Sequence, residues 1–224
     1  MAMLEAAPIV SFLQVTKRYP GGYEALRDIN LEIRAGELVF LTGHSGAGKS
    51  TLLKLLAGME RASAGIVMVG GQNVSTMRRA AKPFLRQNLG LVFQDHKLLY
   101  DRSAFDNVML PLLVTGLPHN EAARRARAAL DKVGLLERDK ANPISLSGGE
   151  QQRLCIARAV VNRPNIILAD EPTASLDPDN AQAVMEIFRS FHQVGVTILV
   201  ATHDQMAIEH LRPRVIALNK GQVA

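Results

Sequence analysis

The segment Gly43–Ser50 (GHSGAGKS) constrains the fold more than any other part of this 224-residue sequence. It fits the pattern G-x-x-x-x-G-K-[ST]. The apolar run Leu38–Leu41 precedes it, and the leucines of residues 50–57 have the spacing of a helix that ends at Gly58. Glycines between a strand and a helix let backbone N–H groups turn toward phosphate oxygens. The sequence therefore predicts an α/β fold with a phosphate-binding loop at this point.

The side chains at the end of this loop have predictable tasks. Lys49 should reach the β- and γ-phosphates of a nucleotide and so belong to the catalytic residues as well, and Ser50 should bind Mg²⁺ through its hydroxyl. The predicted nucleotide-binding residues of this segment are Gly43, His44, Ser45, Gly46, Ala47, Gly48, Lys49, Ser50 and Thr51.

Two adjacent carboxylates, Asp170 and Glu171, follow the apolar run Ile166–Ala169. Ligands of open α/β sheets gather at the carboxyl ends of the strands. Successive side chains of a strand point in opposite directions, so these two carboxylates should have different tasks. We expect Asp170 to bind Mg²⁺ and Glu171 to act on the water that attacks the γ-phosphate. A pair that only caps the strand end is the alternative, which the phosphate-binding loop makes less favoured.

A second glycine turn, Leu146–Arg153 (LSGGEQQR), opens another helix in a chain that already has a complete phosphate-binding loop. The N-terminus of a helix attracts anions. This second helix N-terminus has no nucleotide of its own to bind. We therefore expect Ser147, Gly148 and Gly149 to serve the nucleotide of a neighbouring subunit.

These motifs, in this order, resemble those of the ABC (ATP-binding cassette) ATPases, and the resemblance covers nearly the whole chain. Leu146–Glu150 is similar to the LSGGQ signature of that family, with Glu150 in the final place. The resemblance implies an enzyme that hydrolyses ATP to ADP and phosphate with Mg²⁺. It also implies a homodimer that encloses two ATP molecules, each between the phosphate-binding loop of one subunit and the signature helix of the other.

The resemblance assigns four further residues. Tyr19 falls where an aromatic ring stacks on adenine, although a lone tyrosine could also pack at a strand edge. Gln94 matches a glutamine that contacts Mg²⁺ and the attacking water. Asp177 matches a loop that crosses the dimer interface, and His203 matches a histidine that contacts the γ-phosphate. The implied catalytic residues are Lys49, Gln94, Glu171 and His203, and the implied Mg²⁺ ligands are Ser50, Gln94 and Asp170.

The resemblance also implies the architecture. We expect a P-loop ABC ATPase domain with a mixed or parallel sheet core, an antiparallel β subdomain and a helical subdomain. The single domain should cover residues 1–224, with a RecA-like core of about 1–94 and 164–224 and a helical subdomain of about 95–163.

Local patterns predict several elements directly. Strand alternation runs through residues 9–41 and apolar strands return at Asn165–Ala169 and Val196–Ala201. A helix from about Asp179 to Gln193 between the last two makes them parallel.

The middle of the chain, residues 100–163, loses the strand pattern. Glu121–Val133 is predicted as a helix, with Asn120 as its N-cap and Gly134 just past its end.

Composition narrows the environment. The formal charge of +5 allows an anionic neighbour such as nucleic acid or an acidic lipid surface, and it also fits a merely solvated surface. Cys155 is the only cysteine, so no internal disulfide forms, which suits a reducing compartment. Met1–Pro8 lacks the basic region of a secretion signal, and apolar runs such as Val196–Ala201 are far shorter than the roughly 20 residues that span a bilayer. The cytosolic side of a membrane is favoured.

Longer matches narrow the choice within the family. Leu41–Lys49, Phe93–Leu99, Asp101–Ser103 and Phe105–Val108 resemble the FtsE family of bacterial cell-division ATPases. That resemblance implies two such chains bound to an FtsX-like integral membrane protein, peripheral on the cytoplasmic face of the inner membrane at the division site. The complex would pass ATP-driven motion to cell-wall hydrolases.

Three questions stay open at this point. The first is the match to the FtsE family itself, because Ala174-Ser175 stands where many FtsE-like chains have Gly-Asn. The energy subunit of a lipoprotein-release or macrolide-type exporter is the alternative function, and a DNA-handling ABC ATPase is a more distant one, with no nucleic-acid partner expected. Asp95–Tyr100 either docks on the membrane partner or packs the helical subdomain.

Overall fold

The computed structural model describes residues 7–224. Residues 1–6 lie outside the described residues. The predicted domain bounds and the prediction of no secretion signal both include them. The strands are β1 (Val10–Arg18), β2 (Glu24–Ile33), β3 (Leu38–Thr42), β4 (Ala64–Val69), β5 (Gln72–Asn73), β6 (Leu89–Val92), β7 (Ile166–Asp170), β8 (Thr197–Ala201), β9 (Arg214–Asn219) and β10 (Gln222–Val223). The α-helices are α1 (Lys49–Leu56), α2 (Lys82–Gln87), α3 (Ala104–Val114), α4 (His119–Lys132), α5 (Gly148–Val160), α6 (Pro178–Gln193) and α7 (Gln205–Leu211).

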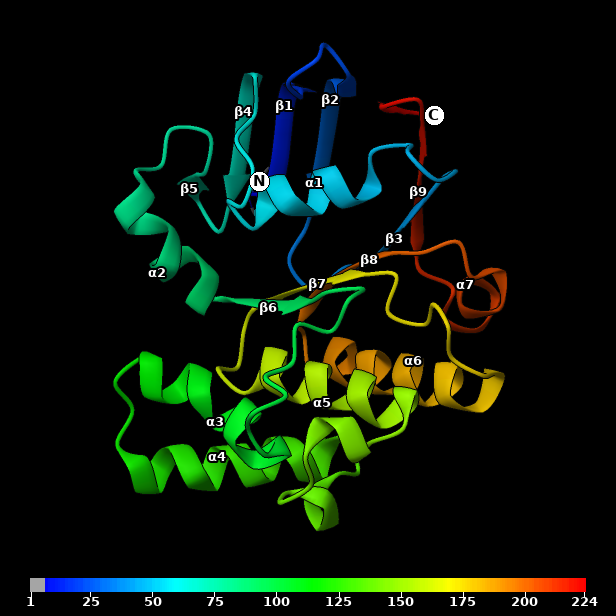
Figure 1. Cartoon of the computed structure of the whole chain (residues 1–224). Helices are drawn as coiled ribbons and strands as arrows, with labels where there is room; N and C mark the ends of the chain where they lie inside the picture. Colours follow the sequence, from blue (N-terminus) through cyan, green and yellow to red (C-terminus); the bar gives the residue numbers. More distant parts are fainter. Residues whose placement is uncertain (1–6) are drawn as a thin grey trace, which may run out of the picture.

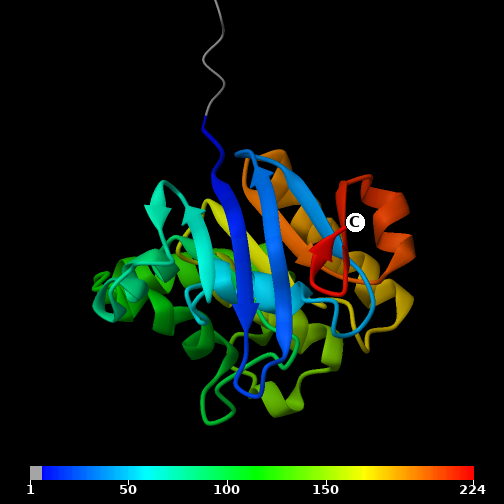
Figure 2. The same cartoon turned by 90° about the horizontal axis from the view of Figure 1, so that it is seen from above.

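The elements form layers around two sheets (Figure 1). A four-stranded antiparallel sheet has the order β2-β1-β4-β5, and a six-stranded sheet has the order β10-β9-β3-β8-β7-β6. The five strands of the six-stranded sheet from β9 to β6 pair in parallel, and only β10 is antiparallel. Figure 2 shows β4, β1 and β2 side by side over α1. The predicted fold class is confirmed.

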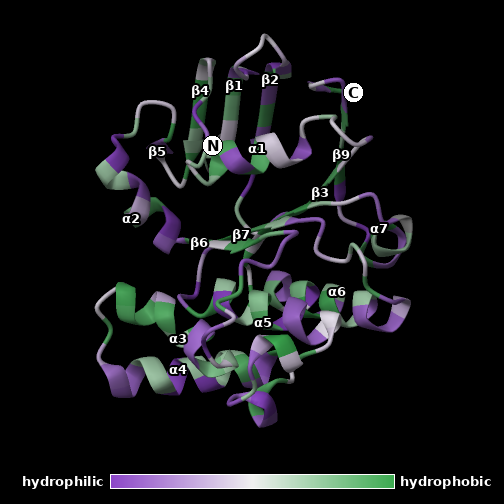
Figure 3. Ribbon diagram, in the orientation of Figure 1, coloured by the Kyte–Doolittle hydropathy of each residue, from purple (hydrophilic) through white to green (hydrophobic). Residues whose placement is uncertain are grey.

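Each central strand of the six-stranded sheet is buried on both faces. In β3, Val39 and Leu41 join one hydrophobic core with α1 and the antiparallel sheet, while Leu38 and Phe40 join a second core with α3, α4, α5 and α6. In β8, neighbouring residues divide between the two cores in the same way. A parallel sheet covered by helices or a second sheet on both faces needs such unbroken apolar strands. Figure 3 shows these strands as predominantly hydrophobic.

The predicted elements occur with small shifts at their ends. The parallel pairing of β7 and β8 around α6 is confirmed. The N-cap prediction for α4 is wrong, because Asn120 lies inside the helix and Pro118 precedes its first turn. The Pro118 carbonyl accepts from Ala122 N at 2.9 Å, and the extended backbone of Pro118 sets the helix start two residues early. Gly134 does follow the end of α4, with a φ of 70°.

Residues 95–163 contain α3, α4 and α5, and every described strand lies outside this segment. The three helices share one hydrophobic core with β-strand residues such as Phe40 and Val92. The division into a RecA-like core and a helical subdomain stays a proposal. The hydrophobic core continues across the proposed boundary between them. None of the helices in residues 7–224 is long and apolar enough to cross a membrane.

Candidate active site

The phosphate-binding loop connects β3 to α1 and depends on its glycines. Gly48 precedes α1 with a φ of 109°, and a Cβ there would lie 2.6 Å from the carbonyl oxygen of Ala25. Gly43 has a φ of 137°, and a Cβ there would collide with the carbonyl oxygen of Leu218. Any other residue would therefore displace the loop from β9 or from β2. The loop lies at the carboxyl end of β3, where ligands of open α/β sheets bind.

Lys49 is the cation at the start of α1. Its side chain is 8% exposed, and its Nζ donates to the Gly43 carbonyl at 2.7 Å. The same Nζ lies 3.6 Å from Oε1 of Glu171. The loop thus holds a positive charge beside the partly buried carboxylate of Glu171, which follows β7.

The two carboxylates of the acidic pair have different partners. Asp170 Oδ1 accepts from Ser50 Oγ at 2.9 Å, whereas Glu171 Oε2 lies 3.0 Å from His203 Nδ1. Glu171 has a φ of 47°, and its backbone N donates to the Ala201 carbonyl at 2.8 Å. A left-handed backbone is uncommon for glutamate and is often found at functional sites. This turn directs the Glu171 carboxylate toward Lys49 rather than toward Ser50, the partner of Asp170.

The Ser50–Asp170 pair fits a magnesium ion. Mg²⁺ takes oxygen ligands and is usually held by one or two carboxylates together with substrate phosphates. Ser50 and Asp170 offer a hydroxyl and a carboxylate oxygen that already lie within hydrogen-bond distance. Burial raises the pKa of Asp170, and the hydrogen bond from Ser50 acts in the opposite direction. A cation at this point would favour the ionised carboxylate.

These elements enclose one cleft of about 880 Å³. The cleft brings the phosphate-binding loop together with Gln94, which follows β6, and with Glu171 and His203. The lining residues are Tyr23, Thr42, Gly43, His44, Ser45, Gly46, Ala47, Gly48, Lys49, Ser50, Thr51, Gln94, Glu171, Ala174, His203 and Ile208. Two of the predicted catalytic residues, Gln94 and His203, are exposed, and the side chain of His203 is 75% exposed.

Two tyrosines lie near the adenine end predicted for the site. Tyr19 does not line the cleft, but its hydroxyl is 3.4 Å from Oγ1 of Thr51, which does. The ammonium of Lys17 lies 4.7 Å from the centre of the Tyr19 ring, where a cation is attracted to the π face. Tyr23 lines the cleft and donates its hydroxyl proton to the Gly46 carbonyl at 3.0 Å. The sequence reasoning missed Tyr23, although it follows Tyr19 closely in a Gly-Gly turn.

The signature segment begins α5 with a capping box. The Ser147 hydroxyl accepts from Glu150 N at 3.3 Å, and Glu150 Oε2 accepts from Ser147 N at 2.8 Å. The hydrogen bond from the Ser147 backbone lowers the pKa of Glu150. Ser147, Gly148 and Gly149 do not line the cleft of their own chain. Figure 1 shows α5 and α1 on opposite faces of the six-stranded sheet.

The signature helix contacts the first turn of α6 within the same chain. A Cβ on Gly149 would collide with the side chain of Asn180, and Arg153 Nη1 donates to Asn180 Oδ1 at 2.9 Å. Asp177 caps α6 by accepting from Asn180 N at 2.9 Å, and hydrogen bonds with Asn180 lower its pKa. Asp177, like the signature residues, lies outside the cleft lining. The structure therefore places the signature residues and Asp177 together, apart from the cleft that the phosphate-binding loop lines.

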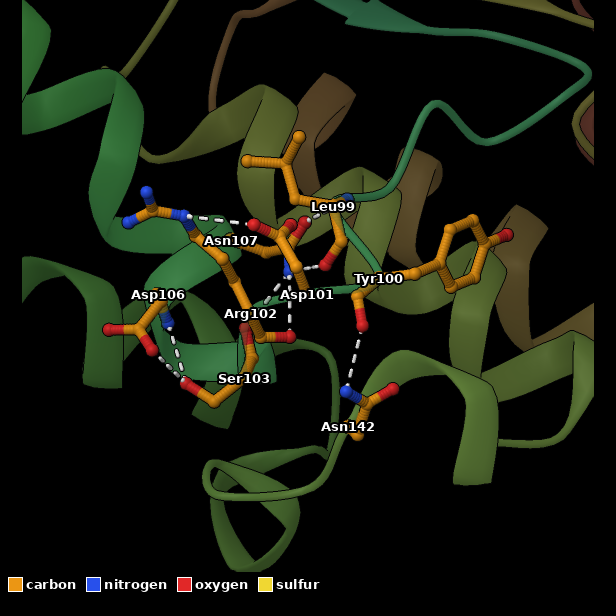
Figure 4. Close-up of polar contacts among 8 residues, drawn as sticks. All are labelled: Leu99, Tyr100, Asp101, Arg102, Ser103, Asp106, Asn107 and Asn142. Carbon is orange, nitrogen blue, oxygen red and sulfur yellow. Dashed lines mark hydrogen bonds and ion pairs between the residues drawn. The ribbon is translucent and has the colours of Figure 1, made fainter.

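The segment that follows Gln94 is fixed by side chains from α3 and α5, and Figure 4 shows the contacts of Asn107 from α3. The buried Asn107 accepts from Leu99 N at 2.8 Å and donates to the Leu99 carbonyl at 2.9 Å. Its Nδ2 also donates to the carbonyls of Arg102 and Ser103. Leu98 is 6% exposed and belongs to the core around α3 and α5. Packing is therefore the observed role of Leu98.

Arg158 of α5 holds the start of the same segment. Its guanidinium donates to the carbonyls of His96 and Lys97 at 2.6 Å each. The thiol of Cys155 donates to the His96 carbonyl at 3.1 Å. His96 and Lys97 both have positive φ values, 57° and 51°. The strained turn after Gln94 is thus attached to the signature helix.

Comparisons with known proteins show which sequences this chain is similar to. The family model described as "ABC transporter" matches residues 26–174. The cell division ATP-binding protein FtsE of Escherichia coli K12 is 49% identical over 215 residues, which cover 96% of this chain and 97% of the relative. The protein of the same name in Streptococcus pneumoniae D39 is 40% identical over 96% of this chain and 94% of the relative.

Solved structures show the same similarity. The ATP-binding cassette MJ0796, in a dimeric post-hydrolysis state bound to ADP and Pi, matches with a TM-score of 0.88 and 34% identity over 96% of both chains. The cbiO1 protein of Clostridium perfringens, part of the ABC transporter complex cbiONQ, matches with a TM-score of 0.88 and 29% identity over 98% of this chain and 88% of that chain.

Proposed function

The chain belongs to the ABC transporter family, and from this membership we propose that it is the ATP-hydrolysing subunit of a membrane complex that acts in bacterial cell division. As a member of the family it binds ATP with Mg²⁺ and hydrolyses ATP to ADP and phosphate. One observation carries the proposal: a single cleft joins the phosphate-binding loop to Glu171 and His203, in a chain that is 49% identical to a cell-division ATPase over nearly its whole length.

The positions of the charged groups support their proposed roles. Lys49 would pair with the β- and γ-phosphates, and Ser50, Asp170 and Gln94 would hold Mg²⁺, which when bound neutralises phosphate charge. Glu171 would accept a proton from the attacking water. As the water oxygen bonds to the γ-phosphorus, the bond to the β-phosphate oxygen breaks and ADP leaves.

Glu171 is suited to this role by its surroundings. Its side chain is 14% exposed, with Lys49 on one carboxylate oxygen and His203 on the other. Oriented from both sides, the carboxylate needs little rearrangement to face a water above the γ-phosphate. His203 would contact the γ-phosphate oxygens, because it follows the carboxyl end of β8, lines the cleft and has a side chain that is 75% exposed.

The dimer follows from the separation of the two sets of site residues. Ser147, Gly148, Gly149 and Asp177 lie outside the cleft of their own chain, so we propose that they complete the nucleotide site of a second copy. Cassettes of this family form dimers, as the MJ0796 structure does, and pair with membrane proteins. The homodimer would enclose two ATP molecules, each with a phosphate-binding loop from one subunit and a signature helix from the other.

The proposed partner is an FtsX-like integral membrane protein. The complex would then lie on the cytoplasmic face of the inner membrane at the division site and transmit motion to cell-wall hydrolases. The similarity to proteins named for cell division from Escherichia coli and Streptococcus pneumoniae supports this choice.

Depletion with complementation tests the division role. Depleted cells should form long, undivided filaments, most severely in low-salt medium where turgor opposes constriction. Wild-type protein and the control variant Lys140→Ala should restore division, and Lys49→Ala should not. A membrane protein captured with the wild-type chain in mild detergent should be FtsX-like. Depleted cells of ordinary length with mislocalised lipoproteins would instead identify an exporter subunit.

A further inference from the structure

The positive charge of this protein is concentrated in one part of the chain. Residues 61–94 contain five cations and no carboxylate: Arg61, Arg78, Arg79, Lys82 and Arg86. The chain has 26 lysines and arginines and 21 aspartates and glutamates, so the remaining 21 cations match the 21 carboxylates. The whole formal charge of +5 therefore belongs to the segment that contains β4, β5, α2 and β6.

Four of these cations line one pocket of about 560 Å³ beside α2. Arg86 is anchored at the end of α1, where Nε donates to the Ala57 carbonyl at 3.0 Å and Nη2 to the Gly58 carbonyl at 3.2 Å. Arg61 Nε donates to the Ser75 carbonyl at 3.2 Å. These acceptors are neutral carbonyls, so they orient the two guanidinium groups without cancelling their charge.

Arg79 and Lys82 complete the cationic side of the pocket. Within residues 7–224, no salt bridge joins any of the five cations to a carboxylate. Elsewhere in the described residues, cations such as Arg18, Arg27 and Arg214 pair with a carboxylate, whereas four of these five line one pocket together. Such a cluster attracts phosphate groups, which accept hydrogen bonds from arginine and lysine.

Apolar side chains also line the pocket, and they select among phosphate-bearing ligands. Met59, Met77 and Pro83 share its lining with the cations, and Met59 is 39% exposed. Phe84, the next residue of α2, is 65% exposed. Figure 3 shows hydrophilic residues at both ends of α2 and less polar ones between them. Cations next to exposed methionine, proline and phenylalanine match the boundary between lipid headgroups and acyl chains.

We propose that this pocket and α2 form a docking site for a bilayer surface that contains anionic phospholipid, with headgroup phosphate between Arg79 and Lys82. Single-stranded nucleic acid is less suited, because successive bases need successive stacking rings, and Phe84 is the only aromatic residue in positions 61–92. The site goes beyond the proposed function: it would give each ATPase subunit a direct membrane contact besides its protein partner.

Vesicle co-sedimentation of the purified full-length chain tests the proposal. Vesicles of phosphatidylglycerol and phosphatidylcholine should bind the protein at 50 mM NaCl, and vesicles of phosphatidylcholine alone should not. Each cation near an anionic surface contributes about fivefold in binding, so Arg79→Glu/Lys82→Glu should weaken binding by about 30-fold or more. At 1 M NaCl, binding should be lost because screening shortens the range of the charges to about 3 Å.

A matched control separates this site from net charge alone. Lys140→Glu/Lys220→Glu changes the formal charge equally at exposed positions outside residues 61–94, and it should reduce binding far less. ATP affinity should be unchanged in both double variants, because none of these residues lines the nucleotide cleft.

Four results would overturn the proposal. They are absence of vesicle binding by the wild type, equal losses in the two double variants, equal binding to neutral vesicles, and displacement from vesicles by millimolar glycerol phosphate. If the protein does not bind vesicles, but Arg79→Glu/Lys82→Glu no longer captures the membrane partner in detergent, the patch binds that partner instead. If the protein does not bind vesicles, but captures an oligonucleotide that Arg79→Glu/Lys82→Glu does not capture, the patch binds nucleic acid.

Discussion

Replacing Asn107 with alanine should loosen the segment that follows Gln94. The side chain is fully buried and makes two hydrogen bonds with the backbone of Leu99, at 2.8 and 2.9 Å. Alanine would leave that N–H and that carbonyl without these partners, and each unsatisfied buried group costs about 1–3 kcal/mol. We expect a loss of about 3 kcal/mol in the free energy of unfolding, which lowers Tm by roughly 6–12 °C in a domain of this size.

Asn142→Ala is the matched control. Asn142 Nδ2 donates to the Tyr100 carbonyl at 2.8 Å, in the same segment (Figure 4), but Asn142 is exposed and water can replace it. Its loss should cost under about 1 kcal/mol. Urea unfolding of both variants would measure the difference. An Asn107→Ala protein within 0.5 kcal/mol of wild type, or equal losses in the two variants, would refute the assignment of Asn107 as the clamp.

Four further outcomes test the site and the burial of Cys155. Lys49→Ala should weaken ATP binding by about 10- to 100-fold, since a hydrogen bond to a charged group contributes about 1.5–3 kcal/mol, and unchanged affinity in isothermal titration would contradict its phosphate role. Glu171→Gln should keep ATP binding and accumulate as an ATP-bound dimer while turnover falls by roughly 10²–10⁴-fold; a monomer with near wild-type turnover would be the contrary result. Mixing Ser147→Arg with Lys49→Ala should restore part of the ATPase activity that each lacks alone, through a heterodimer with one intact site, and a dimer structure with both elements on one nucleotide would exclude this. Burial raises the pKa of Cys155 to about 12, so a thiolate-specific reagent at pH 8 should label the unfolded chain much faster than the native one, and equal rates would show that the thiol is accessible.

The parts of the site that could be predicted are those with local causes. The phosphate-binding loop was readable because the apolar β3, the glycines with positive φ and the leucines of α1 are adjacent in sequence. Asp170 and Glu171 do have different surroundings, as predicted, but the strand period is not the cause, because β7 ends at Asp170 and Glu171 lies in a left-handed turn. The left-handed turn at Glu171 was not readable, because its backbone N is held by the Ala201 carbonyl of another strand.

Long-range contacts explain what the sequence did not reveal. Tyr23 enters the cleft because its hydroxyl reaches the Gly46 carbonyl, a partner 23 residues away. The choice between docking and packing for Asp95–Tyr100 depended on burial: Leu98 lies in the core, whereas Tyr100 is 45% exposed. Asn120 is not the N-cap because Pro118 already supplies the extended residue before α4. The residue type at position 120 alone does not reveal where the helix begins.

The signature helix gives the two proposed sets of site residues a mechanical connection. Ser147 caps α5 and Arg158 lies eleven residues later, roughly 16 Å along the helix axis. The guanidinium of Arg158 holds the strained turn at His96 and Lys97 through two hydrogen bonds of 2.6 Å, each worth about 1.5–3 kcal/mol because the donor is charged. A partner's nucleotide that displaces the start of α5 must therefore carry this turn with it or break both bonds. Since β6 ends at Val92 and the turn is fixed to α5, relative motion of helix and sheet would concentrate at residues 93–95, where Gln94 faces the nucleotide cleft.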